Sequence, residues 1–330
     1  MIKRLVIITR SPLRLSIGGG GTDLPFYYKK EKGFLITATM NKYVYCIVKK
    51  RFEEEIRLSY SENEEVGQIQ DLKNDRARQI LEENNFQKHL EVSTLADAPS
   101  GSGLGSSGVF TVGLLNAVKN FQGENWEDKE LAEKAFDIEH NKLGYPCGKQ
   151  DQYAAAFGGL IVLEINRNGE TSVRPLNIDK STIRTLEENL QLFYTGQLRD
   201  SSEVLEAQKK QVLSEDRKMK KMRKIKSIGK EIKEELEKGN TDSFGHLLHK
   251  HWRTKKEFTS KMSNSEIDNA YSKAREEGAL GGKIMGAGGG GFFIFYVNQD
   301  RKEFRKEMEE IGLRHMDFKF DREGTKVINE

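Results

Sequence analysis

The sequence predicts a mixed α+β chain organised as two domains. Its 330 residues exceed the usual length of one domain. Short strand-like runs and helical stretches follow one another through the first half, whereas long, heavily charged helical stretches dominate the second half. Hydrophobic residues make up 36% of the chain, which is enough to build buried cores. We expect the two domains to be residues 1–165 and 166–330.

Charge and cysteine content disfavour several classes of protein. The 54 basic and 51 acidic residues leave a net charge of only +3, without the basic excess typical of nucleic-acid-binding proteins. Cys46 and Cys147 are too few for a disulfide framework or a zinc cluster. No apolar stretch approaches the ~18 residues of a membrane span, and the N-terminal apolar run is too short for a signal peptide. We expect a cytoplasmic protein that binds neither nucleic acid nor membrane.

The elements of the first half follow from local patterns. Strands are expected where β-branched and aromatic residues gather or alternate with polar ones, and Asn41 and Lys42 are expected to form a hairpin turn between two of them. Helices are expected where apolar residues recur at helical spacing, as at Leu72, Ala77 and Ile80. The predicted strands are 5–8, 34–40, 43–48, 56–60, 90–96 and 160–163, and the predicted helices are 72–84, 109–121, 127–143 and 150–157.

The second half is predicted from the same patterns. A charged helical region spans 202–238, and its basic segment 217–226 is expected to be a solvated helix face because acidic residues flank it. A metal site at His246, His249 and His251 is the alternative, because the first two share a helix face. We expect ordinary helix residues instead, since no cysteine or carboxylate stands at ligand spacing. The other predicted helices are 241–261, 265–277 and 301–311, and the predicted strands are 190–195, 292–297 and 316–320.

A loop rich in glycine and serine occupies residues 99–108. A strand-like stretch precedes it and an apolar helical run follows it. The free N–H groups of a helix's first turn and the helix dipole favour anions, and glycines allow a phosphate to approach the backbone closely. The loop therefore predicts a nucleotide-phosphate site.

Two further glycine loops predict a site for a small polar molecule. The four consecutive glycines Gly18–Gly21 can form neither a stable strand nor a helix interior, and Arg14 and Asp23 flank them. The third loop, within residues 281–291, leads into an apolar strand.

Other nucleotide-binding classes fit these loops poorly. Residues 103–108 and 286–291 both match the G-x-G-x-x-G pattern of dinucleotide sites. However, Glu124 and Glu127 come at a helix start and not after a strand, and the second match leads into a strand and not a helix. The Walker motif and the His-Arg-Asp and Asp-Phe-Gly motifs of protein kinases do not occur.

The order and spacing of the three loops resemble the GHMP small-molecule kinases, such as galactokinase, homoserine kinase and mevalonate kinase. The matching motifs are Pro12–Asp23, Pro99–Gly108 and Lys283–Gly291, so the resemblance covers essentially the whole chain. It implies a ribosomal S5 domain 2-like N-terminal domain, a ferredoxin-like C-terminal domain, and an active site in the cleft between them.

Within that family, residues 10–25 and 148–160 look most like the D-glycero-D-manno-heptose 7-phosphate kinases. Gly20 and Gly21 stand where galactokinase has an acid–histidine pair, which disfavours galactokinase itself. Leu13 replaces a usual glycine and Gly108 replaces a usual alanine.

The resemblance also implies the cofactors, ATP and Mg²⁺, and the site residues. Asp151 is expected to act as general base or to orient the acceptor hydroxyl, while Arg14 and Lys149 stabilise charge on the transferred phosphoryl group. Ser107 and Glu139 are expected to bind Mg²⁺, with Ser106 as the alternative hydroxyl ligand. The triphosphate is expected to lie on Pro99, Gly101, Ser102, Gly103, Leu104, Gly105, Ser106 and Ser107. The sugar phosphate is expected to contact Gly20, Gly21, Thr22, Asp23, Arg199, Lys283, Gly286, Ala287, Gly288 and Gly289, with Arg199 and then Lys283 as candidates for its 7-phosphate.

The implied reaction transfers the γ-phosphoryl group of ATP to the anomeric C1 hydroxyl of D-glycero-D-manno-heptose 7-phosphate. The product, the 1,7-bisphosphate, would serve the synthesis of nucleotide-activated heptose for capsule, S-layer or lipopolysaccharide. A fucokinase-like or other sugar-1-kinase is the enzymatic alternative. A non-catalytic sugar or ATP sensor is the other alternative, against which the presence of Asp151, Glu139, Ser107 and Arg14 counts.

Overall fold

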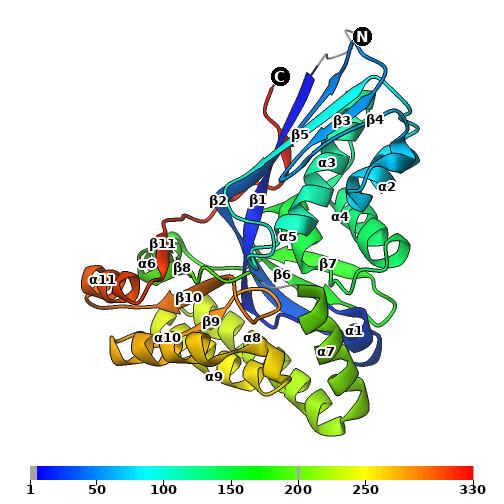
Figure 1. Cartoon of the computed structure of the whole chain (residues 1–330). Helices are drawn as coiled ribbons and strands as arrows, with labels where there is room; N and C mark the ends of the chain where they lie inside the picture. The colour runs from blue at the N-terminus through cyan, green and yellow to red at the C-terminus, as the bar shows by residue number, and fades with distance from the viewer. Residues whose placement is uncertain (1–5, 199–200, 330) are drawn as a thin grey trace.

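The computed structural model describes residues 6–198 and 201–329, in which helices pack on two β-sheets (Figure 1). Among these residues the larger sheet has eight strands and the smaller sheet has four. The predicted α+β class is therefore confirmed. No helix within the described ranges is both long and apolar enough to cross a membrane.

The larger sheet is built around β1 (Val6–Gly18) and β2 (Gly33–Lys50), two long antiparallel strands. Its order is β12-β1-β2-β5-β3-β4, and β6 pairs with both β2 and β7. β5 (Leu90–Ala96) coincides with its predicted range. The other strands are β3 (Ile56–Ser59), β4 (Asn63–Val66), β6 (Leu160–Ile165), β7 (Thr171–Pro175) and β12 (Lys326–Val327).

The predicted hairpin at Asn41 and Lys42 is wrong, because β2 runs through both residues. The second partner of β2 changes at this point, from β6 along residues 33–38 to β5 along residues 44–50. Asn41 instead binds the returning C-terminal segment: its N–H donates to the Lys319 carbonyl at 2.9 Å and its side-chain oxygen accepts from the Lys319 N–H at 2.7 Å. Asn41, a residue type common in turns, thus forms hydrogen bonds with a third segment of the chain.

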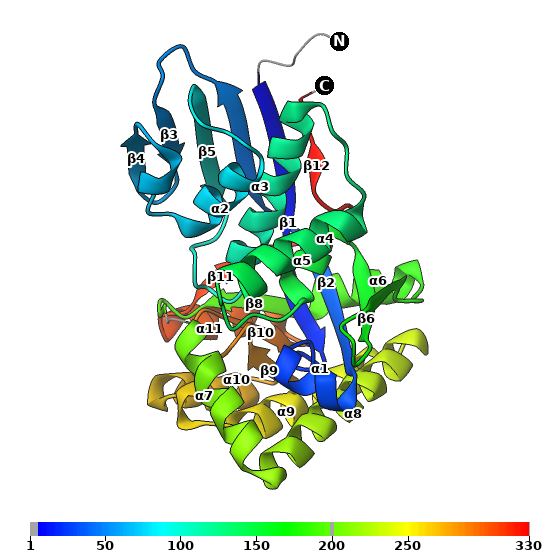
Figure 2. The same ribbon diagram turned by 90° about the vertical axis from the view of Figure 1, so that its right-hand side faces the viewer.

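Helix α3 (Ser106–Gln122) packs on β1 and β2 and fixes the position of the loop before it (Figure 2). The contact is close, since the Thr9 hydroxyl donates to the Gly113 carbonyl at 2.9 Å. α4 (Asp128–Phe136) continues into a π-helical turn, η2 (Asp137–Lys142), where one helix was predicted. The other elements on this side are α1 (Pro25–Glu31), η1 (Ile69–Asp71), α2 (Asp75–Glu83) and α5 (Gln150–Phe157).

The smaller sheet has the order β11-β8-β10-β9, so its strands lie 4-1-3-2 in chain order, as expected for a ferredoxin-like domain. Aromatic side chains fill the core between this sheet and its helices, including Phe193, Trp252 and Phe295. The strands are β8 (Leu190–Tyr194), β9 (Gly281–Ile284), β10 (Phe292–Tyr296) and β11 (Arg314–Met316). The helices of this half include α6 (Lys180–Asn189), α9 (Thr241–Lys256), η3 (Ser260–Met262), α10 (Ser265–Glu276) and α11 (Arg301–Glu310).

Some elements that follow residue 165, the predicted end of the first domain, pack with the elements before it. β7 and β12 both belong to the larger sheet although they follow that residue. The predicted helical region 202–238 consists of α7 (Ser201–Ser214) and α8 (Asp216–Glu237), and α8 packs on β1 and β2. A Cβ on Gly229 of α8 would lie 2.9 Å from the Gly19 Cα, so this helix packs directly against the backbone of the first glycine loop.

Candidate active site

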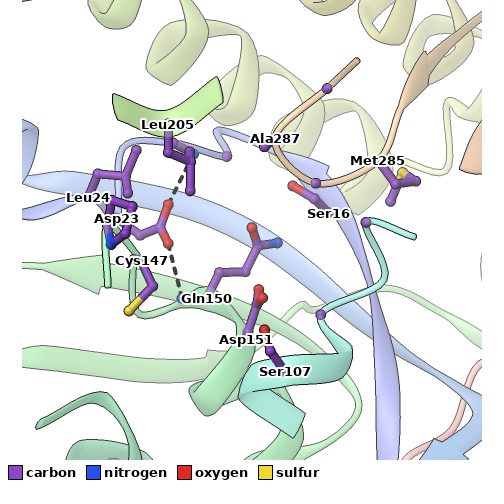
Figure 3. A pocket seen from close by; sticks show the side chains of 18 of the residues that line it. Ser16, Asp23, Leu24, Ser107, Cys147, Gln150, Asp151, Leu205, Met285 and Ala287 are labelled. Atoms are coloured by element: carbon purple, nitrogen blue, oxygen red, sulfur yellow. Dashed lines mark hydrogen bonds between the residues drawn. The ribbon is translucent and has the colours of Figure 1, made fainter. Parts of the chain in front are cut away.

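The three glycine loops meet around one cavity of about 360 Å³. Figure 3 shows the loop that carries Ala287 on one side of this cavity and Asp151 with Ser107 on the other. Many of the predicted site residues line it, namely Arg14, Gly20, Gly21, Asp23, Gly101, Gly103, Gly105, Ser106, Ser107, Glu139, Asp151, Lys283, Gly286, Ala287 and Gly288.

The 99–105 loop enters α3 through left-handed glycines. Gly103 and Gly105 have φ values of 84° and 83°, a conformation that costs other residues energy. A Cβ on Gly103 would also lie 2.6 Å from the carbonyl oxygen of Met285, so the second and third glycine loops touch. Ser106 and Ser107 form the start of α3 and line the cavity. Because a helix's first turn leaves N–H groups without intrahelical partners, this end can bind an anion.

Asp151 and Arg14 form an ion pair beside this loop. Arg14 Nε donates to Asp151 Oδ1 at 2.8 Å, and the arginine side chain is only 6% exposed. The same guanidinium donates to the Gly103 carbonyl, and the Arg14 backbone N–H donates to the Leu104 carbonyl at 3.0 Å. One residue of β1 thus ties the carboxylate on α5 to the phosphate loop.

Asp23 lies at the other end of the cavity, in the first glycine loop. Its two carboxylate oxygens accept from the backbone N–H groups of Gly21 and Gln150, each at 3.0 Å (Figure 3). Burial raises the pKa of the Asp23 carboxyl above its usual range, and the Asp151 charge acts in the same direction, while these N–H groups oppose it. A Cβ on Gly148 would lie 2.0 Å from Asp23 Oδ2, so only glycine fits beside the carboxylate.

Glu139 lies on the π-helical turn η2, a type of distortion common at functional sites. It is 2% exposed, and Arg76 Nε donates to its Oε1 at 2.5 Å. The Gln152 amide donates to its Oε2. The Arg76 guanidinium also lies 4.0 Å from the ring centroid of Tyr145.

The oxygen ligands at the cavity fit Mg²⁺, although the described residues contain no group of three or more His, Cys, Asp or Glu that could hold a metal. Mg²⁺ prefers oxygen ligands and keeps several waters, so it needs few ligands from the protein. The Glu139 carboxylate and the Ser107 hydroxyl both line the cavity and are hard oxygen ligands.

Lys149 does not line the cavity, although its predicted role is to stabilise charge on the transferred phosphoryl group. Its Nζ donates to both carboxylate oxygens of Glu133, at 2.7 and 2.9 Å, and to the Gly169 carbonyl at 2.7 Å. Lys149 is 3% exposed and its Nζ lies 5.0 Å from the ring centroid of Phe136. Lys149 directly precedes α5, and its bonds to Glu133 of α4 fix the start of α5 to α4. We therefore do not retain Lys149 in the proposed catalytic group.

Several other predicted residues shape the loops without lining the cavity. The Thr22 hydroxyl lies 2.7 Å from the Phe34 carbonyl and 2.8 Å from the Gly19 carbonyl, so it fixes the first glycine loop to β2. The Ser102 carbonyl accepts from the Phe292 N–H at 3.1 Å, which joins the phosphate loop to β10. Pro99, Leu104 and Gly289 also lie outside the lining. Arg199 lies outside the described residues.

The structure adds residues to the cavity that the sequence patterns missed, among them Arg76, Gln150, His251 and Lys255. Gln150 was detectable, because it stands next to Asp151 in the matched motif. Its side-chain nitrogen is buried and has no hydrogen-bond partner among the described residues. His251 and Lys255 lie on α9, in a charged helix whose local pattern carries no sign of a site.

These loops and their cavity define a small-molecule kinase, and the comparisons identify its family. The GHMP kinases N terminal domain family matches residues 74–159, and the GHMP kinases C terminal family matches residues 232–312. The chain belongs to the GHMP kinase family and is an ATP-dependent sugar kinase.

Two of its relatives are named as kinases of heptose phosphates. The chain is 33% identical to a D-glycero-alpha-D-manno-heptose 7-phosphate kinase from Campylobacter jejuni, over 97% of this chain and 98% of that protein. A crystal structure of a D-glycero-D-manno-heptose 1-phosphate kinase from Bacteroides thetaiotaomicron is 27% identical, with a TM-score of 0.80 over 98% of this chain and 99% of that chain. A putative sugar kinase from Campylobacter jejuni is 31% identical, with a TM-score of 0.78 over 98% of both chains.

Proposed function

We propose that this kinase transfers the γ-phosphoryl group of ATP to the anomeric C1 hydroxyl of D-glycero-D-manno-heptose 7-phosphate. The observation that carries the proposal is the Arg14–Asp151 pair, held at 2.8 Å where the phosphate loop meets the cavity that also contains Asp23. The product is the 1,7-bisphosphate, a precursor suited to nucleotide activation at C1.

ATP is positioned by the phosphate loop. The backbone N–H groups at the start of α3 and the glycines before it hold the triphosphate, and Ser106 contributes a hydroxyl. Ser107 and Glu139 are the residues that would hold Mg²⁺, which neutralises phosphate charge when bound. Arg76 already contacts Glu139 from the cavity wall, so it keeps that carboxylate oriented.

Asp151 acts on the acceptor hydroxyl. Phosphoryl transfer depends mainly on alignment and charge stabilisation, so a carboxylate that orients the hydroxyl and takes its proton late is sufficient. Arg14 places that carboxylate against the phosphate loop and adds positive charge beside the transferred group.

The sugar lies between the first and third glycine loops. Asp23 accepts hydrogen bonds from sugar hydroxyls, and the unpartnered amide nitrogen of Gln150 donates to another sugar oxygen. The glycines at 20, 21, 286 and 288 line the cavity and let backbone approach the ring.

The choice of heptose 7-phosphate is supported by the whole-length similarity to a kinase named for that sugar. A structural relative is named a heptose 1-phosphate kinase. The sugar hydroxyl that receives the phosphoryl group therefore has to be tested. Similarity to fucokinases is weaker, at 28% identity over 66% of this chain.

An ADP-release assay over a panel of acceptors tests the proposal. With Mg²⁺ and ATP, we expect kcat/KM for heptose 7-phosphate to exceed that for fucose, galactose and mevalonate by at least about 10³-fold, because a site built for polar groups rejects ligands that leave them unpaired. A higher kcat/KM for fucose would favour the alternative sugar-1-kinase. ATP binding without ADP release on any acceptor would favour a sensor. Either of these two results would contradict the proposal.

A further inference from the structure

Three basic side chains gather on the cavity wall formed by α9 and β9. Lys255, Lys283 and His251 all line the cavity. Lys283 is 2% exposed and His251 is 1% exposed. From the sequence, Lys283 is a candidate contact of the sugar phosphate and Lys255 has no predicted role, and the mechanism above uses none of the three.

These groups have few partners within the fold. Lys255 donates to the Gly286 carbonyl, and Lys283 Nζ makes one long contact of 3.4 Å to the Ile17 carbonyl. Both ring nitrogens of His251 are buried without a hydrogen-bond partner. Among the described residues, no carboxylate forms an ion pair with Lys255 or Lys283. Buried cations without counter-charges are costly, so the arrangement is stable only if something offsets that cost.

An anionic group of a ligand would offset this cost. A phosphate oxygen can accept from an ammonium group and from a ring N–H, and such charge-assisted hydrogen bonds are among the strongest in proteins. The cavity already provides one anion site at the start of α3. A second group of cations in the same cavity therefore points to a ligand, or pair of ligands, with a second anionic group.

The position of the cluster indicates which ligand carries that group. Lys283 contacts the carbonyl of Ile17, the residue directly before Gly18–Gly21, and that loop continues to Asp23. Lys255 binds the third glycine loop at Gly286, and its charge is affected by Asp23 as well as by Arg14. The cluster therefore adjoins the two loops assigned to the acceptor.

We propose that Lys255, Lys283 and His251 form a subsite for the phosphate group that the sugar acceptor already carries. The inference rests on the proposed function in one respect, namely that the acceptor is a sugar phosphate. It makes the phosphate a determinant of specificity, and it adds Lys255 and His251 to Lys283, which the sequence already indicated as a candidate for that contact.

Replacing Lys255 by methionine tests the subsite. Methionine keeps the side-chain length without the charge, so Lys255→Met is expected to fold and to be at least as heat-stable as wild type, since it removes an uncompensated cation. We expect KM for heptose 7-phosphate to rise about 30-fold or more, while KM for ATP changes less than threefold. Lys250→Met is the matched control, because Lys250 lies on the same helix, is exposed and pairs with Glu231. An equal rise in the KM for ATP, or an unchanged acceptor KM, would overturn the assignment.

The pH dependence gives a second readout. Burial, together with the nearby charge of Arg14, lowers the pKa of Lys255 to about 8, with Asp23 opposing, and Lys283 and His251 also face this region. The lysine charge that attracts phosphate is present below that pKa and is lost above it. KM for heptose 7-phosphate is therefore expected to rise between pH 7 and pH 9 in wild type, and to be flatter in Lys255→Met. Identical profiles for the two proteins would contradict the role of Lys255.

A binding measurement separates this subsite from the proposed reaction. A non-hydrolysable ATP analogue with Mg²⁺ fills the nucleotide site, and inorganic phosphate is then added while thermal unfolding is followed. We expect phosphate to raise the unfolding temperature of wild type and Lys250→Met but not of Lys255→Met. Loss of the phosphate effect in wild type once the analogue is bound would show that phosphate enters only the nucleotide site, and would overturn the subsite whichever sugar the enzyme uses.

Discussion

Asp151→Asn is expected to lower kcat by about 10³-fold or more while leaving ATP affinity within about threefold of wild type. Asparagine keeps the shape of the side chain, but it can neither take a proton nor keep the ion pair with Arg14 Nε. Because the proposed triphosphate site consists of backbone groups of another segment, nucleotide binding is not expected to depend on this carboxylate. Steady-state kinetics with heptose 7-phosphate and titration with an ATP analogue measure the two effects.

Asp128→Asn is the control for this substitution. Asp128 also lies in the first turn of a helix, α4, but outside the cavity. Both substitutions remove a negative charge from the first turn of a helix. The resulting loss of stability is expected in both variants and is less than about 1 kcal/mol. Near-normal turnover by Asp151→Asn would refute the catalytic assignment.

Arg14→Lys is expected to lower kcat by about 10²-fold although the charge is conserved. The guanidinium binds Asp151 and the Gly103 carbonyl at the same time, and a single ammonium group does not reproduce that fork geometry. Loosening of the Gly103 contact is expected to raise KM for ATP as well, by a smaller factor. Single-turnover kinetics at saturating ATP separate the chemical step from binding.

Arg10→Lys provides the matched comparison. Arg10 lies on the same strand and pairs with Glu323 at 3.2 Å, away from the cavity. Its replacement is expected to leave kcat unchanged. A kcat for Arg14→Lys within threefold of wild type would contradict this prediction. It would mean that the site requires only a positive charge, and not simultaneous hydrogen bonds to Asp151 and Gly103.

The parts of the fold that could be predicted from sequence are those determined by local patterns. β5 and α5 coincide with their predicted ranges, because alternation and helical spacing are unambiguous there. β2 could not be predicted as one strand, since Asn41 and Lys42 are polar and the hydrogen-bond partner of Asn41, Lys319, is distant in sequence. β7 and β12 join the larger sheet through pairings that no local pattern reveals.

The site was predictable where family motifs mark it and unpredictable elsewhere. Arg14, Asp23 and Asp151 line one cavity, as expected from their motifs. Lys149 stands two residues before Asp151 but is bound to Glu133, because side chains two positions apart at the start of a helix face different directions. Lys255 lies in a helix rich in basic residues, and only its position in the folded chain distinguishes it from solvated neighbours.

We propose that one cleft directs the γ-phosphoryl group to the anomeric hydroxyl of a sugar that is already phosphorylated. The most direct test is ³¹P NMR of the product formed from heptose 7-phosphate and ATP with Mg²⁺. We predict one product with two phosphorus signals, one of which is coupled to the anomeric proton. Asp151→Asn is expected to form no such product. A new phosphate coupled to any other sugar proton, or unconsumed ATP, would contradict the account.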